Sequence, residues 1–209
     1  MNNRGNFCCG TIIIITIKGD SAMEEKTIKY YNRHAKSYYQ NTVDLKLDNI
    51  YQEFLSQLKD NAHILDAGCG SGRDSLFFLK QGYQVTAIDA AKELVKLSSK
   101  LLGQEVLQLR FQELEFEEEF DGIWACASLL HISRDEIDDV LERFSRALVK
   151  GGVIYMSFKY GDKEVYEKGR FFNYYDEDSF QKLVDKFVEL EVIKLWQTID
   201  VREDRDDEF

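Results

Sequence analysis

Three glycines at every second position, Gly68, Gly70 and Gly72, directly follow an apolar run that starts at Ile64. A helix-like pattern begins at once behind them, and such a strand–loop–helix join typically binds a ligand through its backbone. The dinucleotide fingerprint G-x-G-x-x-G would need its third glycine at position 73, where the chain has Arg73, and no Gly-Lys-Ser/Thr follows for phosphate binding. The spacing therefore favours a ligand that lies against bare backbone without a pyrophosphate.

Two carboxylates at the ends of strand-like runs narrow the choice of ligand. Asp66 precedes the first glycine, where it could attract an ammonium group or simply brace the loop. Asp89 ends the next strand-like run, where it could accept hydrogen bonds from both hydroxyls of a ribose or serve as a helix N-cap. A ligand with a ribose and a cationic amino-acid end suits both carboxylates. S-adenosylmethionine has these parts, whereas NAD needs the pyrophosphate cradle.

Strand-like and helical patterns alternate along the chain and would position this loop. We expect an α/β fold, a doubly wound, mainly parallel Rossmann-like sheet with helices on both faces. Ligands of such sheets bind beyond the carboxyl ends of the strands, where the glycine loop falls. The expected strands are 63–67, 84–90, 105–111, 120–128, 152–159 and 190–200, and the expected helices are 24–40, 47–59, 73–81, 92–102, 134–150 and 176–187.

Composition limits the classes of protein to consider. The 209 residues include 44% hydrophobic and 13% aromatic residues, which suits one domain with a substantial core. The net charge of −11 counts against a broad electrostatic grip on nucleic acid. The four cysteines, at positions 8, 9, 69 and 126, form no C-x-x-C pair, so we expect neither a zinc site nor a disulfide framework. We expect a cytoplasmic location.

Residues 1–22 differ in texture from the rest and are expected to be an N-terminal extension. Its run TIIIITIK, residues 11–18, is too short to span a membrane and suggests one strand. No signal-peptide pattern surrounds it, so we expect no membrane partner. Residues 23–209 would form the main domain, with a helical lid at about 24–60.

Four segments together resemble a known family. ILDAGCGSGRD, VTAIDA, FDGIWACASLLHI and LVKGGVIYMSFK look like successive motifs of class I S-adenosylmethionine-dependent methyltransferases. Within that class, residues 23–209 are most similar to the small bacterial tellurite-resistance-type, small-molecule methyltransferases. The resemblance implies methyl transfer to a small-molecule acceptor. An RNA or protein methyltransferase and a non-catalytic S-adenosylmethionine-binding protein remain alternatives, and a nicotinamide oxidoreductase is the least favoured.

The resemblance also implies a set of cofactor-binding residues. Backbone groups of Gly68 and Cys69 would meet the methionine end, Asp89 the ribose, and Phe111 the adenine. Relatives often have an acid just before that aromatic residue, where this chain has Arg110. The carbonyl groups at positions 125 and 126 would orient the methionine ammonium. The full expected set is Asp66, Gly68, Cys69, Gly70, Gly72, Asp89, Ala90, Phe111, Ala125 and Cys126.

The acceptor would lie beyond the fourth strand. His131 could act there as a general base or orient the acceptor, or it could be a packing residue. Tyr31 and Tyr39, on one stripe of the lid helix, are candidate contacts to cofactor or acceptor, or ordinary packing. Lys159, at the end of the fifth strand, could point into the same space or be a solvated lysine. The aromatic segment 169–176 lies where the family has a substrate-facing loop. Tyr174 in it could line a small acceptor pocket or belong to the core of the next helix.

The chain stops where relatives usually add a last antiparallel strand. The sequence therefore predicts that this strand is missing from the sheet. Residues 11–18 are the one unassigned strand-like run, and we hypothesise that they dock on the sheet in its place; otherwise the chain is a fragment with reduced stability.

Overall fold

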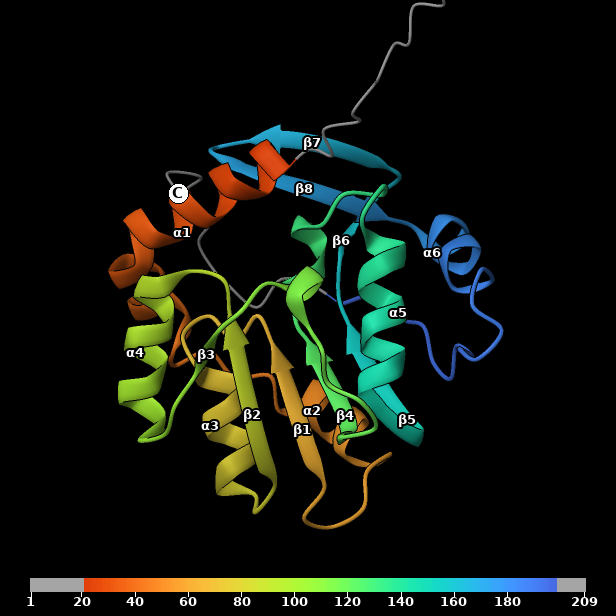
Figure 1. Ribbon diagram of the computed structural model, residues 1–209, viewed down its shortest axis with the longest axis horizontal. Coiled ribbons are helices and arrows are strands. Elements are labelled where there is room, and N and C mark those ends of the chain that lie inside the picture. The colour runs from red at the N-terminus through yellow and green to blue at the C-terminus, as the bar shows by residue number, and fades with distance from the viewer. Residues whose placement is uncertain (1–20, 199–209) are drawn as a thin grey trace, which may run out of the picture.

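The computed structural model describes residues 21–198 of the chain, and Figure 1 shows the arrangement of its elements. Five parallel strands form the main sheet in the order β3-β2-β1-β4-β5, which confirms the predicted doubly wound parallel fold. The strands are β1 (His63–Ala67), β2 (Gln84–Asp89), β3 (Leu107–Gln108), β4 (Phe120–Ala125) and β5 (Leu148–Met156).

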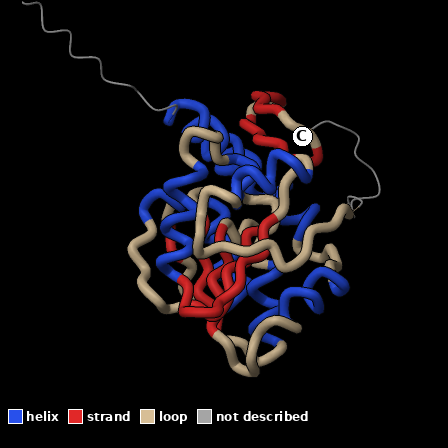
Figure 2. Tube along the Cα trace, turned by 90° about the vertical axis from the view of Figure 1, so that its right-hand side faces the viewer, coloured by secondary structure: helices blue, strands red, loops and turns tan. Residues whose placement is uncertain are grey.

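Helices cover both faces of this sheet (Figure 2). One apolar core joins the sheet to α5 and α6, and a second joins it to α2 and α3. Helix α4 contacts both α3 and α1. The helices are α1 (Ser21–Thr42), α2 (Asp48–Leu55), α3 (Arg73–Lys80), α4 (Lys92–Leu102), α5 (Ile137–Ala147) and α6 (Glu177–Val184).

Strand β1 occupies the centre because its side chains can be buried on both faces. Ile64 and Leu65 are fully buried, and such an uninterrupted apolar run is typical of an inner parallel strand. Ile64 lies opposite Val85 in β2 and opposite Gly122 in β4. A Cβ atom at Gly122 would lie 2.7 Å from the Phe54 ring, so the glycine allows α2 to pack closely on the sheet.

A second, three-stranded sheet follows β5, with the order β6-β8-β7 (Figure 1). It consists of β6 (Lys159–Tyr160), β7 (Lys163–Glu167) and β8 (Arg170–Tyr175). The segment 169–176, expected as a loop or as part of the next helix, is therefore mainly a strand. Lys168 and Gly169 join β7 to β8 with φ angles of 49° and 81°, the left-handed conformation of a two-residue hairpin turn.

Several element boundaries differ from the sequence prediction, among them the start of β5 at Leu148 and three with a local structural reason. The third strand covers only Leu107–Gln108, because the backbone turns into a short 3₁₀ helix, η1, at Phe111–Glu113. Helix α5 begins at Ile137, and Ser133 holds the preceding turn by accepting hydrogen bonds at its carbonyl oxygen from Glu136 and Ile137. The strand predicted at 190–200 is wrong over its described part, since residues 188–198 carry no regular structure.

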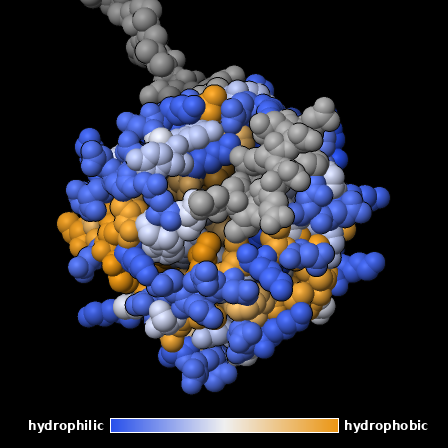
Figure 3. Space-filling model, turned by 180° about the vertical axis from the view of Figure 1, so that it is seen from behind, coloured by the Kyte–Doolittle hydropathy of each residue, from blue (hydrophilic) through white to orange (hydrophobic). Residues whose placement is uncertain are grey.

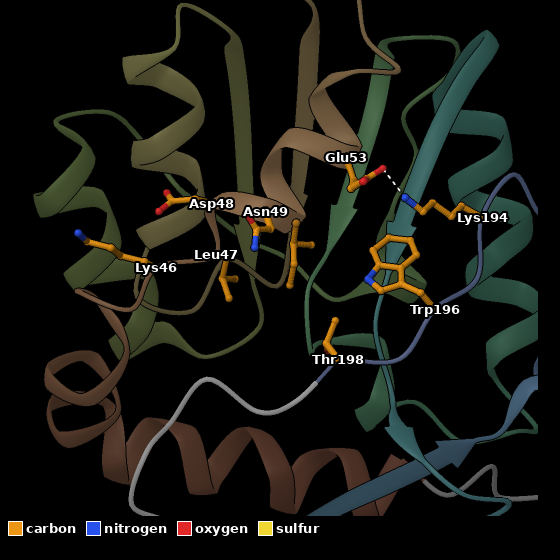
Figure 4. A pocket seen from close by; sticks show the side chains of 9 residues that line it. Lys46, Leu47, Asp48, Asn49, Glu53, Lys194, Trp196 and Thr198 are labelled. Carbon is orange, nitrogen blue, oxygen red and sulfur yellow. Dashed lines mark ion pairs between the residues drawn. The ribbon is translucent and has the colours of Figure 1, made fainter.

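The C-terminal described segment instead folds back beside α2. Lys194 forms an ion pair with Glu53 at 2.7 Å (Figure 4). The Trp196 ring lies 6.1 Å from that of Tyr155. Within residues 21–198 the main sheet has no antiparallel member, and its two edge strands are β3 and β5. From behind, apolar areas lie among a mainly hydrophilic surface (Figure 3). Residues 11–18 lie outside the described part, and so does the predicted extension up to residue 20.

Candidate functional site

A cavity of about 90 Å³ lies where β1, β2 and β4 end, beneath α1. Figure 1 shows these strands pointing toward α1, which crosses their carboxyl ends. The structure brings seven predicted site residues together in the lining of this cavity. They are Tyr31, Gly68, Gly70, Asp89, Ala90, Phe111 and His131.

The glycine loop is shaped by close contacts that leave no room for side chains. The amide groups of Gly68 and Cys69 both donate to the carbonyl oxygen of Ile88, at 3.0 and 2.9 Å. Gly68 has a φ of 80°, and a Cβ atom there would lie 2.6 Å from Cβ of Ser128. The Ser128 hydroxyl in turn donates to the carbonyl oxygen of Ala67 at 2.7 Å. The loops after β1 and β4 are thereby fastened to each other.

Asp89 joins the glycine loop to the start of α4. Its carboxylate accepts hydrogen bonds from the amides of Gly70, at 2.9 Å, and Ala91, at 2.7 Å. Burial raises the pKa of Asp89 to about 6, although both backbone hydrogen bonds act to lower it. A carboxylate has about four lone-pair sites, so Asp89 can still accept hydrogen bonds from a ligand in the cavity.

Other residues of the expected cofactor set lie behind the cavity wall. Asp66 is 1% exposed and accepts a hydrogen bond of 2.5 Å from the Ser75 hydroxyl. This contact agrees with the alternative in which Asp66 braces the loop. Burial raises its pKa, and the charge of Asp74 raises it further. The Cys69 thiol lies 3.7 Å from the Ser98 hydroxyl. Gly72, Ala125 and Cys126 are likewise absent from the cavity lining.

Helix α1 contributes Tyr31 and Tyr38 to the cavity, rather than the predicted pair Tyr31 and Tyr39. Seven residues span almost two helical turns, so Tyr38 returns to the face of Tyr31, whereas Tyr39 is rotated away. The two rings are T-shaped with centroids 5.2 Å apart. A Cβ atom at Gly70 would lie 3.0 Å from Cε1 of Tyr38, so this ring rests directly on the glycine loop.

His131 links α1 to the second sheet. It lies in the short 3₁₀ helix η2 (Leu129–His131) after β4. Its Nδ1 is 2.6 Å from the carbonyl oxygen of Phe171, and its Nε2 is 2.8 Å from the Tyr31 hydroxyl. Burial lowers the pKa of His131 to about 4, and the charges of Arg170 and Lys159 act in the same direction. The imidazole is therefore neutral near pH 7.

Lys159 and Tyr174 meet in the second sheet and not in the cavity lining. The Lys159 amino group lies 3.2 Å from both the Tyr174 hydroxyl and a carboxylate oxygen of Glu167. It also sits 3.9 Å from the centroid of the Phe172 ring. Because the Phe172 ring also lies beside His131, the pair is close to the His131 end of the site but does not line the cavity.

Arg110 lies at the adenine end expected from the resemblance. Its guanidinium donates to Glu25 at 2.7 Å and lies 3.8 Å from Glu24, so it ties α1 to the segment after β3. Glu24 itself lines the cavity, and its burial raises the pKa of its carboxyl group. An acid thus reaches this end of the cavity from α1 instead of from the position before Phe111.

Sequence reasoning missed a buried polar network directly below the glycine loop. Arg73 pairs with the neighbouring Asp74 through two hydrogen bonds of 2.6 and 2.9 Å. The Tyr51 hydroxyl and, at 2.9 Å, the Trp124 indole N–H also donate to this carboxylate. The network joins α2, α3 and β4. The signal that could have revealed this network is the Arg73-Asp74 pair, because Arg73 stands where the dinucleotide fingerprint has its third glycine.

A larger, open pocket of about 490 Å³ lies between α2 and the C-terminal segment, and Figure 4 shows its lining. It is lined by Lys46, Asp48, Glu53, Lys194 and Trp196 among others, and by none of the predicted site residues. Among residues 21–198, no group of three or more histidine, cysteine or acidic side chains is placed to hold a metal ion. No helix in the same range is long and apolar enough to cross a membrane.

A family model for methyltransferase domains matches residues 64–152, from β1 into β5. The chain is similar to an uncharacterized methyltransferase of Staphylococcus carnosus, with 23% identity over 137 residues that cover 65% of this chain and 66% of that protein. It is also similar to a ubiquinone biosynthesis O-methyltransferase of Xanthomonas oryzae pv. oryzae, with 33% identity over 104 residues, 46% of this chain and 42% of that protein. The chain therefore matches less than two thirds of the length of either relative.

Solved methyltransferases share the fold. The 1,6-didemethyltoxoflavin-N1-methyltransferase of Burkholderia thailandensis, solved with 1,6-didemethyltoxoflavin and S-adenosylhomocysteine, has a TM-score of 0.65 at 22% identity, over 84% of this chain and 81% of that one. A TehB-like S-adenosylmethionine-dependent methyltransferase of Corynebacterium glutamicum has a TM-score of 0.54 at 18% identity, over 80% and 83%. The family model shows that residues 64–152 form a methyltransferase domain, and these solved structures share its fold. Together they support a class I S-adenosylmethionine-dependent methyltransferase.

Proposed function

We propose that this protein transfers the methyl group of S-adenosylmethionine to a small-molecule acceptor. The observation that carries the proposal is the cavity at the ends of β1 and β2, in which Gly68, Gly70 and Asp89 lie together with His131. When bound, the cofactor supplies an electrophilic methyl group on a sulfonium. The chain's own residues then have to hold the cofactor, align the acceptor and exclude water.

The residues present fit the cofactor. Asp89 can accept hydrogen bonds from ribose hydroxyls at the tip of β2. The backbone of Gly68 and Gly70 offers the methionine end a surface without side chains. Leu94, Phe111 and other apolar side chains line the remaining end, where an adenine ring would be held.

The cavity must enlarge before it can hold this cofactor. Its volume of about 90 Å³ is well below the ~300–1,000 Å³ of ordinary small-molecule sites. Tyr38 rests on Gly70, and the Tyr31 ring lies 5.2 Å from it, with its hydroxyl on His131; both residues come from α1. The proposal therefore includes a movement of α1 or of its side chains, which agrees with the role of a lid for the N-terminal helices.

Three observations support a small-molecule acceptor over a macromolecule. The cavity lies beneath α1, which the second sheet contacts from outside. The net charge is −11, and the proteins named above include a 1,6-didemethyltoxoflavin-N1-methyltransferase and a ubiquinone biosynthesis O-methyltransferase. We further propose a cytoplasmic location, which agrees with the free thiols of Cys69 and Cys126.

Calorimetric titration of the full chain with S-adenosylmethionine, S-adenosylhomocysteine and NAD tests the cofactor part of the proposal. We expect micromolar binding of the first two and at least about tenfold weaker binding to the Asp89→Ala variant, because hydrogen bonds to a charged group are lost. The exposed Asp60→Ala variant is the matched control. Absence of binding by a folded sample, or equal binding of NAD, would contradict the proposal. Product analysis with candidate acceptors then tests the transfer.

A further inference from the structure

The tautomer of His131 is fixed by its neighbours. A backbone carbonyl oxygen only accepts hydrogen bonds, so the Nδ1 atom that lies 2.6 Å from the Phe171 oxygen must carry the proton. In the neutral ring Nε2 then has a lone pair and can only accept. The Tyr31 hydroxyl, 2.8 Å away, is therefore the donor of this second hydrogen bond. Burial raises the pKa of Tyr31, which keeps this hydroxyl protonated.

Strand β8 holds the imidazole in this orientation. The backbone amide of Phe171 donates to the Thr27 hydroxyl at 3.0 Å, so the residue whose carbonyl binds His131 is itself anchored to α1. The Phe172 ring lies beside the imidazole, with centroids 5.0 Å apart. Nε2 of His131 is thus a positioned acceptor that faces whatever lies in the place of the Tyr31 hydroxyl.

Two cations border the same place. The guanidinium of Arg170 lies 6.0 Å from the centroid of the Tyr31 ring and 5.1 Å from that of Phe172. The Lys159 amino group, which also pairs with Glu167 at 3.2 Å, lies 3.9 Å from the centroid of the Phe172 ring. Positive charges here favour a group that develops negative charge on oxygen, and they disfavour a cationic amine.

Tyr31 occupies a space that belongs to the cavity. Tyr31 and His131 line it together with Gly68, where the methionine end of the cofactor would lie. Tyr31 and Tyr38 sit on the same face of α1, so a movement that lifts Tyr38 from Gly70 also withdraws Tyr31 from Nε2. What remains is a space of the size of a phenol, with a fixed hydrogen-bond acceptor at one end.

We propose that the acceptor is a hydroxylated aromatic ring that is methylated on oxygen, and that its hydroxyl replaces that of Tyr31 on Nε2 of His131. This inference rests on the proposed function. The acceptor oxygen forms a bond to the methyl carbon, the carbon–sulfur bond breaks, and its electron pair stays on sulfur as a thioether. The proton of the hydroxyl passes to Nε2 of His131, which makes His131 the general base.

The test uses nitrogen-15 NMR of the full chain labelled at its three histidines, with His131 assigned through the His131→Gln variant. In the wild-type chain we expect the Nδ1–H tautomer with a hydrogen-bonded Nε2. In the Tyr31→Ala variant the Nε2 signal should move to the position of a free imidazole nitrogen. Added phenol should restore it, and anisole, which has the same ring and no donor, should not.

Binding constants from the same titrations give the size of the effect. Phenol should bind the Tyr31→Ala variant about tenfold more tightly than anisole, since one hydrogen bond is at stake, and also more tightly than aniline. The Tyr31→Phe variant keeps the ring and should lose the Nε2 hydrogen bond, which keeps the test valid if the alanine variant does not fold.

The inference is overturned if His131 has the Nε2–H tautomer, if anisole binds as well as phenol, or if aniline binds more tightly. These titrations need no cofactor. Calorimetry of the same variant with S-adenosylhomocysteine reports the cofactor site separately, so failure of this inference and failure of the proposed function are distinguished.

Discussion

The side-chain oxygen of Asn32 on α1 lies 3.0 Å from the backbone nitrogen of Glu93 and accepts its hydrogen bond in the first turn of α4. The residue at the N-cap position of α4, Ala91, offers no side-chain cap. Asn32 therefore supplies from another helix the cap that the sequence of α4 lacks. The same contact fastens the helix that covers the cavity to the helix that follows Asp89.

We expect the Asn32→Ala substitution to lower the free energy of unfolding by about 1 kcal/mol, the usual value of an N-cap hydrogen bond. Urea denaturation of both chains measures the difference. The exposed Gln40→Ala variant, on the same helix, serves as control and should stay within about 0.5 kcal/mol of the wild-type chain. Equal stability of the Asn32 and Gln40 variants would contradict the capping role.

Gly70 should tolerate alanine less well than another glycine of similar conformation. Gly70 and Gly103 have φ angles of 56° and 67°, so each Gly→Ala change costs about 1 kcal/mol of backbone strain. A Cβ atom at Gly70 also lies 3.0 Å from Tyr38, whereas nothing lies within 4 Å of one at Gly103. Gly70→Ala should therefore be the more destabilising in thermal denaturation, and the excess should disappear when Tyr38→Ala is added. Equal effects at both glycines would show that the Tyr38 ring moves freely.

The Asp74 network should behave as a buried, fully paired carboxylate. Tyr51→Phe removes one of its donors and should cost about 1–2 kcal/mol of folding free energy. Asp74→Ala leaves the Arg73 guanidinium without its partner and should cost about 3–5 kcal/mol. Tyr83→Phe is the control, because the Tyr83 hydroxyl has no hydrogen-bond partner among the described residues. Denaturation curves in which all three variants match would refute a structural role for the network.

The pH dependence of stability should carry the signature of His131. In the unfolded chain its pKa is near 6.5. In the folded chain burial and the neighbouring charges of Arg170 and Lys159 lower this pKa to about 4. Between these values the unfolded chain binds more protons, so the contribution of His131 is complete above pH 6.5 and is lost as the pH falls toward 4. Asp89 acts in the opposite direction, since its folded pKa of about 6 is raised and its contribution is lost as the pH rises from about 4 to 6.

His131→Gln isolates the histidine contribution from that of Asp89. Between pH 7.5 and pH 5, the wild-type chain should lose about 2 kcal/mol relative to this variant. Urea denaturation at the two pH values measures the difference. If the two chains change in parallel, His131 is already able to take up its proton in the folded state.

The parts of the site that depend on local sequence were predictable. The glycine loop directly follows β1 and Asp89 ends β2, and a parallel sheet brings the carboxyl ends of its strands to one edge. Tyr38 was not predicted, because four tyrosines fall on adjoining faces of α1 and only the packed structure shows which face is buried. The contact of His131 with Phe171 joins residues 40 positions apart through a strand that the sequence did not reveal.

The errors in the fold also have physical causes. The β7–β8 hairpin was missed because its turn, Lys168–Gly169, stands at the start of the aromatic segment 169–176, which also suits a loop or a helix. The pattern around Ile193 and Leu195 alternates like a strand, yet a strand forms only with a partner. In this region Lys194 pairs with Glu53, and Trp196 lies near Tyr155, so side-chain contacts replace a ladder of backbone hydrogen bonds.

The central place of β1 has a consequence for how the molecule folds in time. Its pairing with β2 closes a short stretch of chain, whereas the hydrogen bond from the His63 amide to Asp121 at the start of β4 spans 58 residues. Loop-closure entropy makes the longer pairing the slower event. The glycine loop follows β1, and the Ser128 hydroxyl, from the loop after β4, donates to the carbonyl oxygen of Ala67 at its start. The loop therefore takes its final shape only when β4 pairs with β1. The ability to bind a ligand should thus appear with the last, slowest step of sheet assembly and not before it.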